Sequence, residues 1–145
     1  MPLINYVKGL AGDYVKIAFN MAWVADPEST HHEIVSYGGN QLLMYEKITA
    51  LTESVVKPLV DFVCPTGTAV QNARAYIPKK LTRDNFHLSH GLGRYIGGLT
   101  FLKTLCNIDV EAVSWSPDGV SDLEMEISKK AVIAAMNNPF SVSEL

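Results

Sequence analysis

The sequence predicts an α/β fold, specifically an α/β/α sandwich in which helices cover both faces of a parallel sheet. Strand-like and helix-like segments alternate along the chain, which is typical of this class. Both strand-like segments have apolar residues on consecutive positions, as strands of a buried parallel sheet do. The length of 145 residues suits one domain. Two strands are nevertheless too few, because each strand of such a sheet needs neighbours and covering helices.

The first half of the chain is expected to contain two helices around one strand. Apolar spacing predicts a helix over residues 2–12, and consecutive apolar residues predict a strand over 15–23, buried on both faces. Residues 24–40 hold a proline and two adjacent glycines, so we expect a loop. Asn40 is expected to cap a helix over 41–57.

The second strand is predicted over residues 61–67, followed by a short helix over 68–76 that Thr66 or Thr68 would cap. Apolar residues at i, i+3, i+4 and i+7 spacing predict a longer helix over 91–106. These elements are separated by the polar segment that carries the candidate chemistry.

The C-terminal part differs in character from the rest. Residues 108–117 are expected to form a strand or an extended loop. A last helix is predicted from Asp118 or Ser121 to Asn137, with Leu123 among its inward residues.

Composition excludes some function classes. The net charge of −3 leaves no basic footprint for nucleic acid and no polybasic run for an anionic membrane. No apolar run approaches the roughly 18–20 residues of a membrane span. We therefore expect neither a nucleic acid nor a membrane as partner. Cys64 and Cys106 are expected to be buried free thiols.

The segment 81–101 concentrates the residues that could do chemistry. Asp84 and His87 are separated by two residues, and His90 and Arg94 follow. A serine hydrolase needs a histidine to take the hydroxyl proton and a carboxylate to orient that histidine. A tight turn could bring Asp84 onto one ring nitrogen of His87, although a turn aspartate beside a surface histidine remains the simpler alternative.

Three other residues have mainly structural interpretations. Ser89 is expected to cap the following helix, and Arg94 to form an ion pair with Asp84 or the chain end. Trp23 is expected in the core, with a sugar-stacking platform as the alternative.

Three segments together resemble the SGNH (GDSL-like) hydrolases. They are similar to a bacterial branch known only as a domain of unknown function, whose last block has the form RDGxHLS. The segments are TRDNFHLSHGLGRYIGGLTF (82–101), PTGTAVQNAR (65–74) and FNMAWVAD (19–26). The resemblance implies an α/β/α sandwich of five parallel strands and an ester substrate such as a carbohydrate O-acyl group. It implies no metal or organic cofactor.

Only one part of the family's catalytic set carries over to this sequence. Asp84 and His87 match the Asp/His pair, whereas no GDS, GNS or GxSxG segment matches the nucleophile block. Residues 1–106 therefore resemble the C-terminal part of such a domain, and 107–145 would form an extension whose helix packs on it. We expect the isolated chain to lack esterase activity.

Two rival hypotheses stay open. The incomplete sheet would expose an apolar edge, so the chain could be a non-catalytic interaction module that self-associates or binds a complementing N-terminal half. The other rival is a metal-binding α/β domain. Its ligands would be His31, His32, His87 and His90.

Overall fold

The structure, a computed structural model, describes residues 2–12 and 14–145. It combines helices with a small parallel sheet of two strands, so the prediction of an α/β class is confirmed at that level. The elements in chain order are α1 (Pro2–Ala11), β1 (Ala18–Asn20), α2 (His32–Ser36), α3 (Gln41–Leu51), a π-helical turn (Thr52–Val56), a 3-10 turn (Lys57–Leu59), β2 (Phe62–Cys64), α4 (Thr66–Arg74), α5 (Leu92–Cys106) and α6 (Asp122–Asn137).

The two strands pair in parallel, with Phe19 opposite Val63. They are shorter than predicted, and β1 is not buried on both faces, because Ala18 and Asn20 are exposed. One edge of β1 is also unpaired among the described residues. Ile17 and Met21 direct their hydrogen bonds toward β2, so the alternation of a strand directs those of Ala18 and Asn20 to the opposite, open edge. The sequence pattern of 15–23 therefore describes a strand that lacks one neighbour among the described residues.

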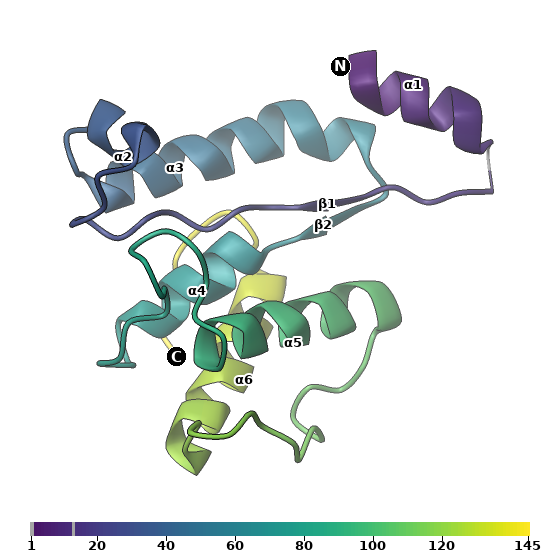
Figure 1. The fold of residues 1–145 in the computed structure, drawn as a ribbon. Coiled ribbons are helices and arrows are strands. Elements are labelled where there is room, and N and C mark those ends of the chain that lie inside the picture. Colours follow the sequence, from purple (N-terminus) through teal and green to yellow (C-terminus); the bar gives the residue numbers. More distant parts are fainter. Residues whose placement is uncertain (1, 13) are drawn as a thin grey trace.

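The main core lies on one side of this sheet. Helices α4, α5 and α6 pack against one another there, while α3 lies on the other side (Figure 1). The C-terminal helix α6 contributes Ala131, Val132 and Ala135, which are completely buried. These small residues pack with Ala69, Val70 and Ala73 of α4. Their size allows the two helices to approach closely.

A smaller apolar cluster fixes the segment that follows β1. Val24 and Ala25 pack there with Ile34 of α2 and with Met44 and Tyr45 of α3. This cluster lies next to the candidate site, because the chain leaves it at Asp26.

Several local predictions are confirmed. The side chain of Asn40 accepts a hydrogen bond from the Leu43 N–H and caps α3. Ser121 forms a reciprocal capping box with Glu124 at the start of α6. Residues 108–117 form a loop, one of the two alternatives predicted for them.

Other local predictions are wrong. The predicted loop 24–40 contains the short helix α2, and regular α-helix in 41–57 ends at Leu51. Neither Thr66 nor Thr68 caps α4, since both are buried within it and Pro65 occupies the cap position.

Two expectations about burial also fail. Leu123 is 66% exposed because the packed face of α6 runs through Glu124, Ser128 and Ala131 instead. Both cysteines are free, but only Cys64 is buried, because Cys106 lies at the exposed end of α5.

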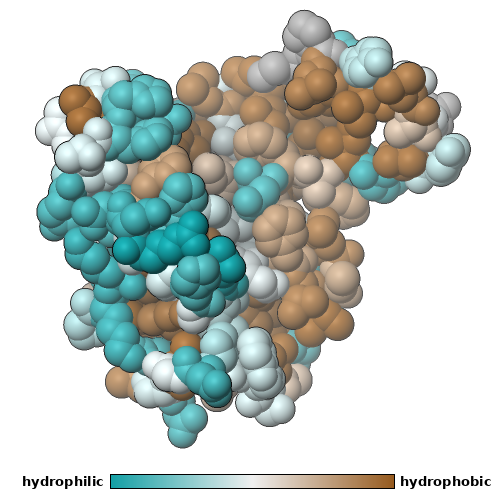
Figure 2. Space-filling model, viewed as in Figure 1, coloured by the Kyte–Doolittle hydropathy of each residue, from teal (hydrophilic) through white to brown (hydrophobic). Residues whose placement is uncertain are grey.

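The N-terminal helix exposes its apolar side chains. Leu3, Tyr6, Val7 and Leu10 are between 41% and 72% exposed. Figure 1 shows α1 at the periphery, beyond one end of the sheet, and Figure 2 shows that it forms a protruding apolar knob. No helix in the described part of the chain is long and apolar enough to cross a membrane.

Candidate functional site

The candidate residues lie on a tight hairpin between Leu81 and Ser89. Thr82 and Leu88 form an antiparallel bridge, and the Ser89 N–H donates to the Leu81 carbonyl at 2.8 Å. Asn85 adopts a left-handed φ of 63° at the tip, a conformation that asparagine tolerates better than most residues. This position corresponds to the glycine of the RDGxHLS pattern. The backbone therefore turns sharply between Asp84 and His87.

The carboxylate of Asp84 binds three groups of this turn. Its Oδ1 accepts hydrogen bonds from the N–H of Phe86 at 3.1 Å and from the N–H of His87 at 2.7 Å. Its Oδ2 lies 2.8 Å from Nδ1 of the His87 ring. The His87 N–H and then the His87 ring lower the pKa of Asp84 to about 2. The carboxylate therefore stays ionised near neutral pH and orients the imidazole.

The pair lies at the molecular surface. The side chains of Asp84 and His87 are 48% and 56% exposed. Arg83 is the nearest cation, with its Nε 3.7 Å from Oδ2 of Asp84. An active site normally excludes water from such a pair, so a further wall would be needed to enclose it.

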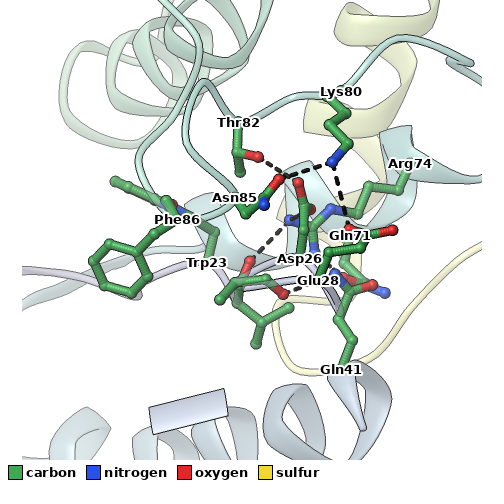
Figure 3. Close-up of polar contacts among 12 residues, drawn as sticks. Trp23, Asp26, Glu28, Gln41, Gln71, Arg74, Lys80, Thr82, Asn85 and Phe86 are labelled. Atoms are coloured by element: carbon green, nitrogen blue, oxygen red, sulfur yellow. Dashed lines mark hydrogen bonds and ion pairs between the residues drawn. The ribbon is translucent and has the colours of Figure 1, made fainter. Parts of the chain in front are cut away.

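Asp26 anchors the hairpin to the segment that follows β1. Its Oδ1 is 3.0 Å from the Arg74 guanidinium, and its Oδ2 accepts a hydrogen bond from the Thr82 hydroxyl (Figure 3). Its backbone N–H donates to the Asn85 carbonyl at 2.8 Å. Asp26 and Arg74 are both largely buried, so their charges stabilise each other in a site of low dielectric.

Two further side chains hold the tip of the hairpin. The indole N–H of Trp23 donates to the Phe86 carbonyl at 2.7 Å, and Lys80 donates to Oδ1 of Asn85 at 2.8 Å. Figure 3 shows these residues converging from separate segments on the hairpin. Sequence reasoning missed the roles of Asp26, Arg74 and Lys80. Only the resemblance of 19–26 and 65–74 to the family marked their neighbourhood as informative.

The four histidines do not form one metal site among the described residues. His31, His32 and Glu33 form a partly exposed cluster with ligand atoms within 4.8 Å of one another. The ring of His31 stacks on Phe86 at 4.2 Å, and Phe86 meets His87 edge-on. His90 instead lies 2.9 Å from an Arg83 nitrogen. The predicted site of His31, His32, His87 and His90 is therefore wrong as a four-ligand set.

The remaining predictions about single residues have different outcomes. Gly91, not Ser89, occupies the cap position of α5, but the Ser89 hydroxyl accepts a hydrogen bond from the Gly93 N–H in the first turn at 2.8 Å. Trp23 is partly buried against the main core, with its polar end on the hairpin. The predicted ion pair of Arg94 with Asp84 is wrong, because Arg83 is the cation near that carboxylate.

Comparisons with known proteins identify a family but no activity. A family model described as "Domain of unknown function (DUF4886)" matches residues 1–135. The structure is similar to the crystal structure of a DUF4886 family protein from Bacteroides uniformis, with a TM-score of 0.92 and 28% sequence identity. The match covers 99% of this chain and 56% of that chain, so this chain spans little more than half of its relative. No curated protein matches.

Proposed function

The chain belongs to the DUF4886 family, and we propose that it carries the acid–base part of an ester hydrolase of the SGNH type. The observation that supports this most is the 2.8 Å contact between Asp84 and Nδ1 of His87 within one hairpin. In this proposal Asp84 is the orienting residue, and His87 is the general base and then the general acid.

The geometry favours one tautomer of His87. An ionised Asp84 accepts the Nδ1 proton, which leaves the lone pair of Nε2 free to accept a proton. Nε2 would take the proton of a serine hydroxyl as that oxygen attacks the ester carbonyl. It would then return the proton to the departing alkoxide, and water would release the acyl group by the same two transfers.

In this proposal, the serine and the oxyanion hole lie in a part of the polypeptide outside these 145 residues. No segment of the chain matches a nucleophile block, and the structural relative is considerably longer than the match. The proposed whole fold is an α/β/α sandwich whose extra strands continue the sheet beyond β1. Such strands would also supply the wall that the exposed Asp84 and His87 lack. Carbohydrate O-acyl esters are the proposed substrate class.

A domain-replacement chimera tests this proposal. The matched part of the Bacteroides uniformis protein is replaced by this chain, and hydrolysis of p-nitrophenyl acetate is measured. We expect turnover by the chimera, a loss of about 1,000-fold or more with His87→Ala, and none by the isolated chain. A folded but inactive chimera contradicts the proposal, as does activity that survives His87→Ala. His90→Ala is the matched control and should leave the rate unchanged.

A second candidate is a non-catalytic interaction module. The exposed apolar face of α1 and the open edge of β1 favour it, since both could bind another polypeptide without any chemistry. A folded chimera that hydrolyses no ester, together with self-association of the isolated chain, would favour this candidate over the first.

A further inference from the structure

A cluster of side chains that can bind a metal ion lies where the chain enters the short helix α2. His31 has an extended backbone with a ψ of 134°, and the helix begins at the next residue. This change of backbone direction leaves the rings of His31 and His32 side by side, with their centroids 4.7 Å apart. Glu33 follows in the first turn, and the three residues each offer a ligand atom within 4.8 Å of the others. Figure 1 shows α2 at the end of the molecule opposite α1.

The ring of His31 is already held in place. It stacks on Phe86 with a centroid distance of 4.2 Å and an angle of 10° between the planes. The backbone N–H of His31 donates to the Ser29 hydroxyl oxygen at 3.2 Å. A ligand that is fixed before the ion arrives loses little conformational freedom on binding. His32 and Glu33 are exposed, so their side chains can adjust to complete the site.

One nitrogen of His31 lacks a partner. Its Nδ1 is buried and makes no hydrogen bond within the described part of the protein. Oε2 of Glu33 lies 3.8 Å from it, which is too far for a hydrogen bond. Zinc bonds to imidazole nitrogen and to carboxylate oxygen are about 2.0 to 2.2 Å long, so one ion can reach both atoms at their present separation. Because a bound ion lies closer to a nitrogen than a water molecule does, it fits where water is excluded.

The types of ligand favour a transition-metal ion. Two imidazoles and a carboxylate, with a further position for water, are a set by which proteins hold zinc. Magnesium and calcium instead prefer oxygen ligands throughout. The Glu33 carboxylate forms no ion pair with a lysine or arginine among the described residues, so its charge can offset that of the ion.

We propose that His31, His32 and Glu33 bind one zinc ion. Nδ1 of His31, a ring nitrogen of His32 and the carboxylate of Glu33 are the protein ligands, and water completes the coordination. The site shares no residue with the Asp84–His87 pair, so it stands independently of the proposed hydrolase.

Calorimetric titration of the 145-residue chain, without a histidine tag, tests the site with zinc chloride. We expect one zinc ion per chain, and much weaker binding of magnesium and calcium. His32→Gln should weaken zinc binding by about tenfold or more, because a ligand is lost. His90→Gln removes an exposed histidine outside the cluster and should leave the affinity unchanged. No zinc binding at submillimolar concentration, equal effects of the two variants, or magnesium binding as tight as that of zinc overturns the proposal.

Glu33→Gln separates the role of the carboxylate from that of the fold. The variant keeps the size of the side chain and loses its charge. It should melt at nearly the same temperature as the wild type without zinc, yet bind zinc about tenfold more weakly. Unchanged affinity would overturn the assignment of Glu33 as a ligand.

NMR locates the ion independently of affinity. Zinc should shift the signals of the Phe86 ring, because this ring stacks on His31. The signals of Phe140, whose ring lies beside Lys57, should stay in place. Phe86 signals that do not respond to zinc would overturn the placement of the ion at His31.

Discussion

The carboxylate of Asp84 accounts for the geometry of the hairpin. It receives two backbone N–H groups and a ring nitrogen within one turn, so it fixes both the backbone and the imidazole of His87. Asn85 allows the turn through its left-handed backbone. The group that orients His87 therefore also shapes the loop that carries it.

The pKa of Asp84 gives the first prediction. We expect its carboxyl to titrate in a ¹³C NMR experiment at about 2, because hydrogen bonds to His87 favour the ionised form. His87→Ala should raise this value, since the ring contact is lost, while His90→Ala should not change it. A wild-type midpoint near the unperturbed value of about 3.9 would contradict the geometry.

The same shift fixes the pH dependence of the hairpin. The pKa of Asp84 is lower in the folded state than in the unfolded chain, so the ionised carboxylate stabilises the fold above the unfolded pKa. That contribution falls as the pH drops toward about 2 and is absent once the group is protonated in both states.

Helix α5 shows how the elements support the site. A methyl group at Gly93 would lie 2.2 Å from the carbonyl oxygen of Leu81, which also accepts the hydrogen bond that closes the hairpin. At Gly98, on the same helix, a methyl group would meet nothing within 4 Å. Gly93 is therefore required for the close approach of the hairpin to the helix.

These two glycines provide a matched pair of variants. Gly93→Ala should destabilise the protein by about 1 to 3 kcal/mol, because the hairpin must move. Gly98→Ala should stabilise it by about 0.5 to 1 kcal/mol, since alanine loses less backbone entropy than glycine when it folds into an exposed helix. Urea denaturation measures both changes in the free energy of unfolding, and amide NMR shifts show whether the hairpin moves. Equal effects of the two substitutions would contradict the contact between Gly93 and Leu81.

The sequence predicted most of the helices and strands, but it predicted fewer of the residues at which they begin and end. The helix caps at Asn40 and Ser121 were predictable because a side chain and its own neighbours determine them. The exposure of Leu123 and Cys106 was not predictable, because the packed face of each helix depends on distant residues. The turn that joins Asp84 to His87 was predictable, because only two residues separate them in the sequence. The contact between Asp26 and Arg74 was not predictable, because 48 residues separate them in the sequence.

At the scale of the whole molecule, the N-terminal part leaves apolar surface and a strand edge uncovered. The apolar residues of α1 and the free edge of β1 both lack cover within the described chain, whereas the core of α4, α5 and α6 is well buried. Exposed apolar surface of this kind promotes association. It is also the surface that additional strands of a longer protein would cover.

Sedimentation velocity should therefore detect concentration-dependent association of the chain. Leu10→Glu should reduce it, because this side chain is 72% exposed on the apolar face of α1. Val35→Glu, at a 59% exposed position on α2, is the matched control and should have little effect. A stable monomer at all concentrations would contradict the view that α1 and β1 need a partner.

The central claim is that His87 serves a nucleophile lying outside these 145 residues. Labelling with a fluorophosphonate, followed by peptide mass spectrometry, tests it most directly in the chimera and in the isolated chain. We predict one labelled serine, in the segment contributed by the Bacteroides uniformis protein. Its labelling should depend on His87, and the isolated chain should not be labelled. Labelling of a serine within the 145 residues, or labelling of the chimera that persists with His87→Ala, would contradict the claim.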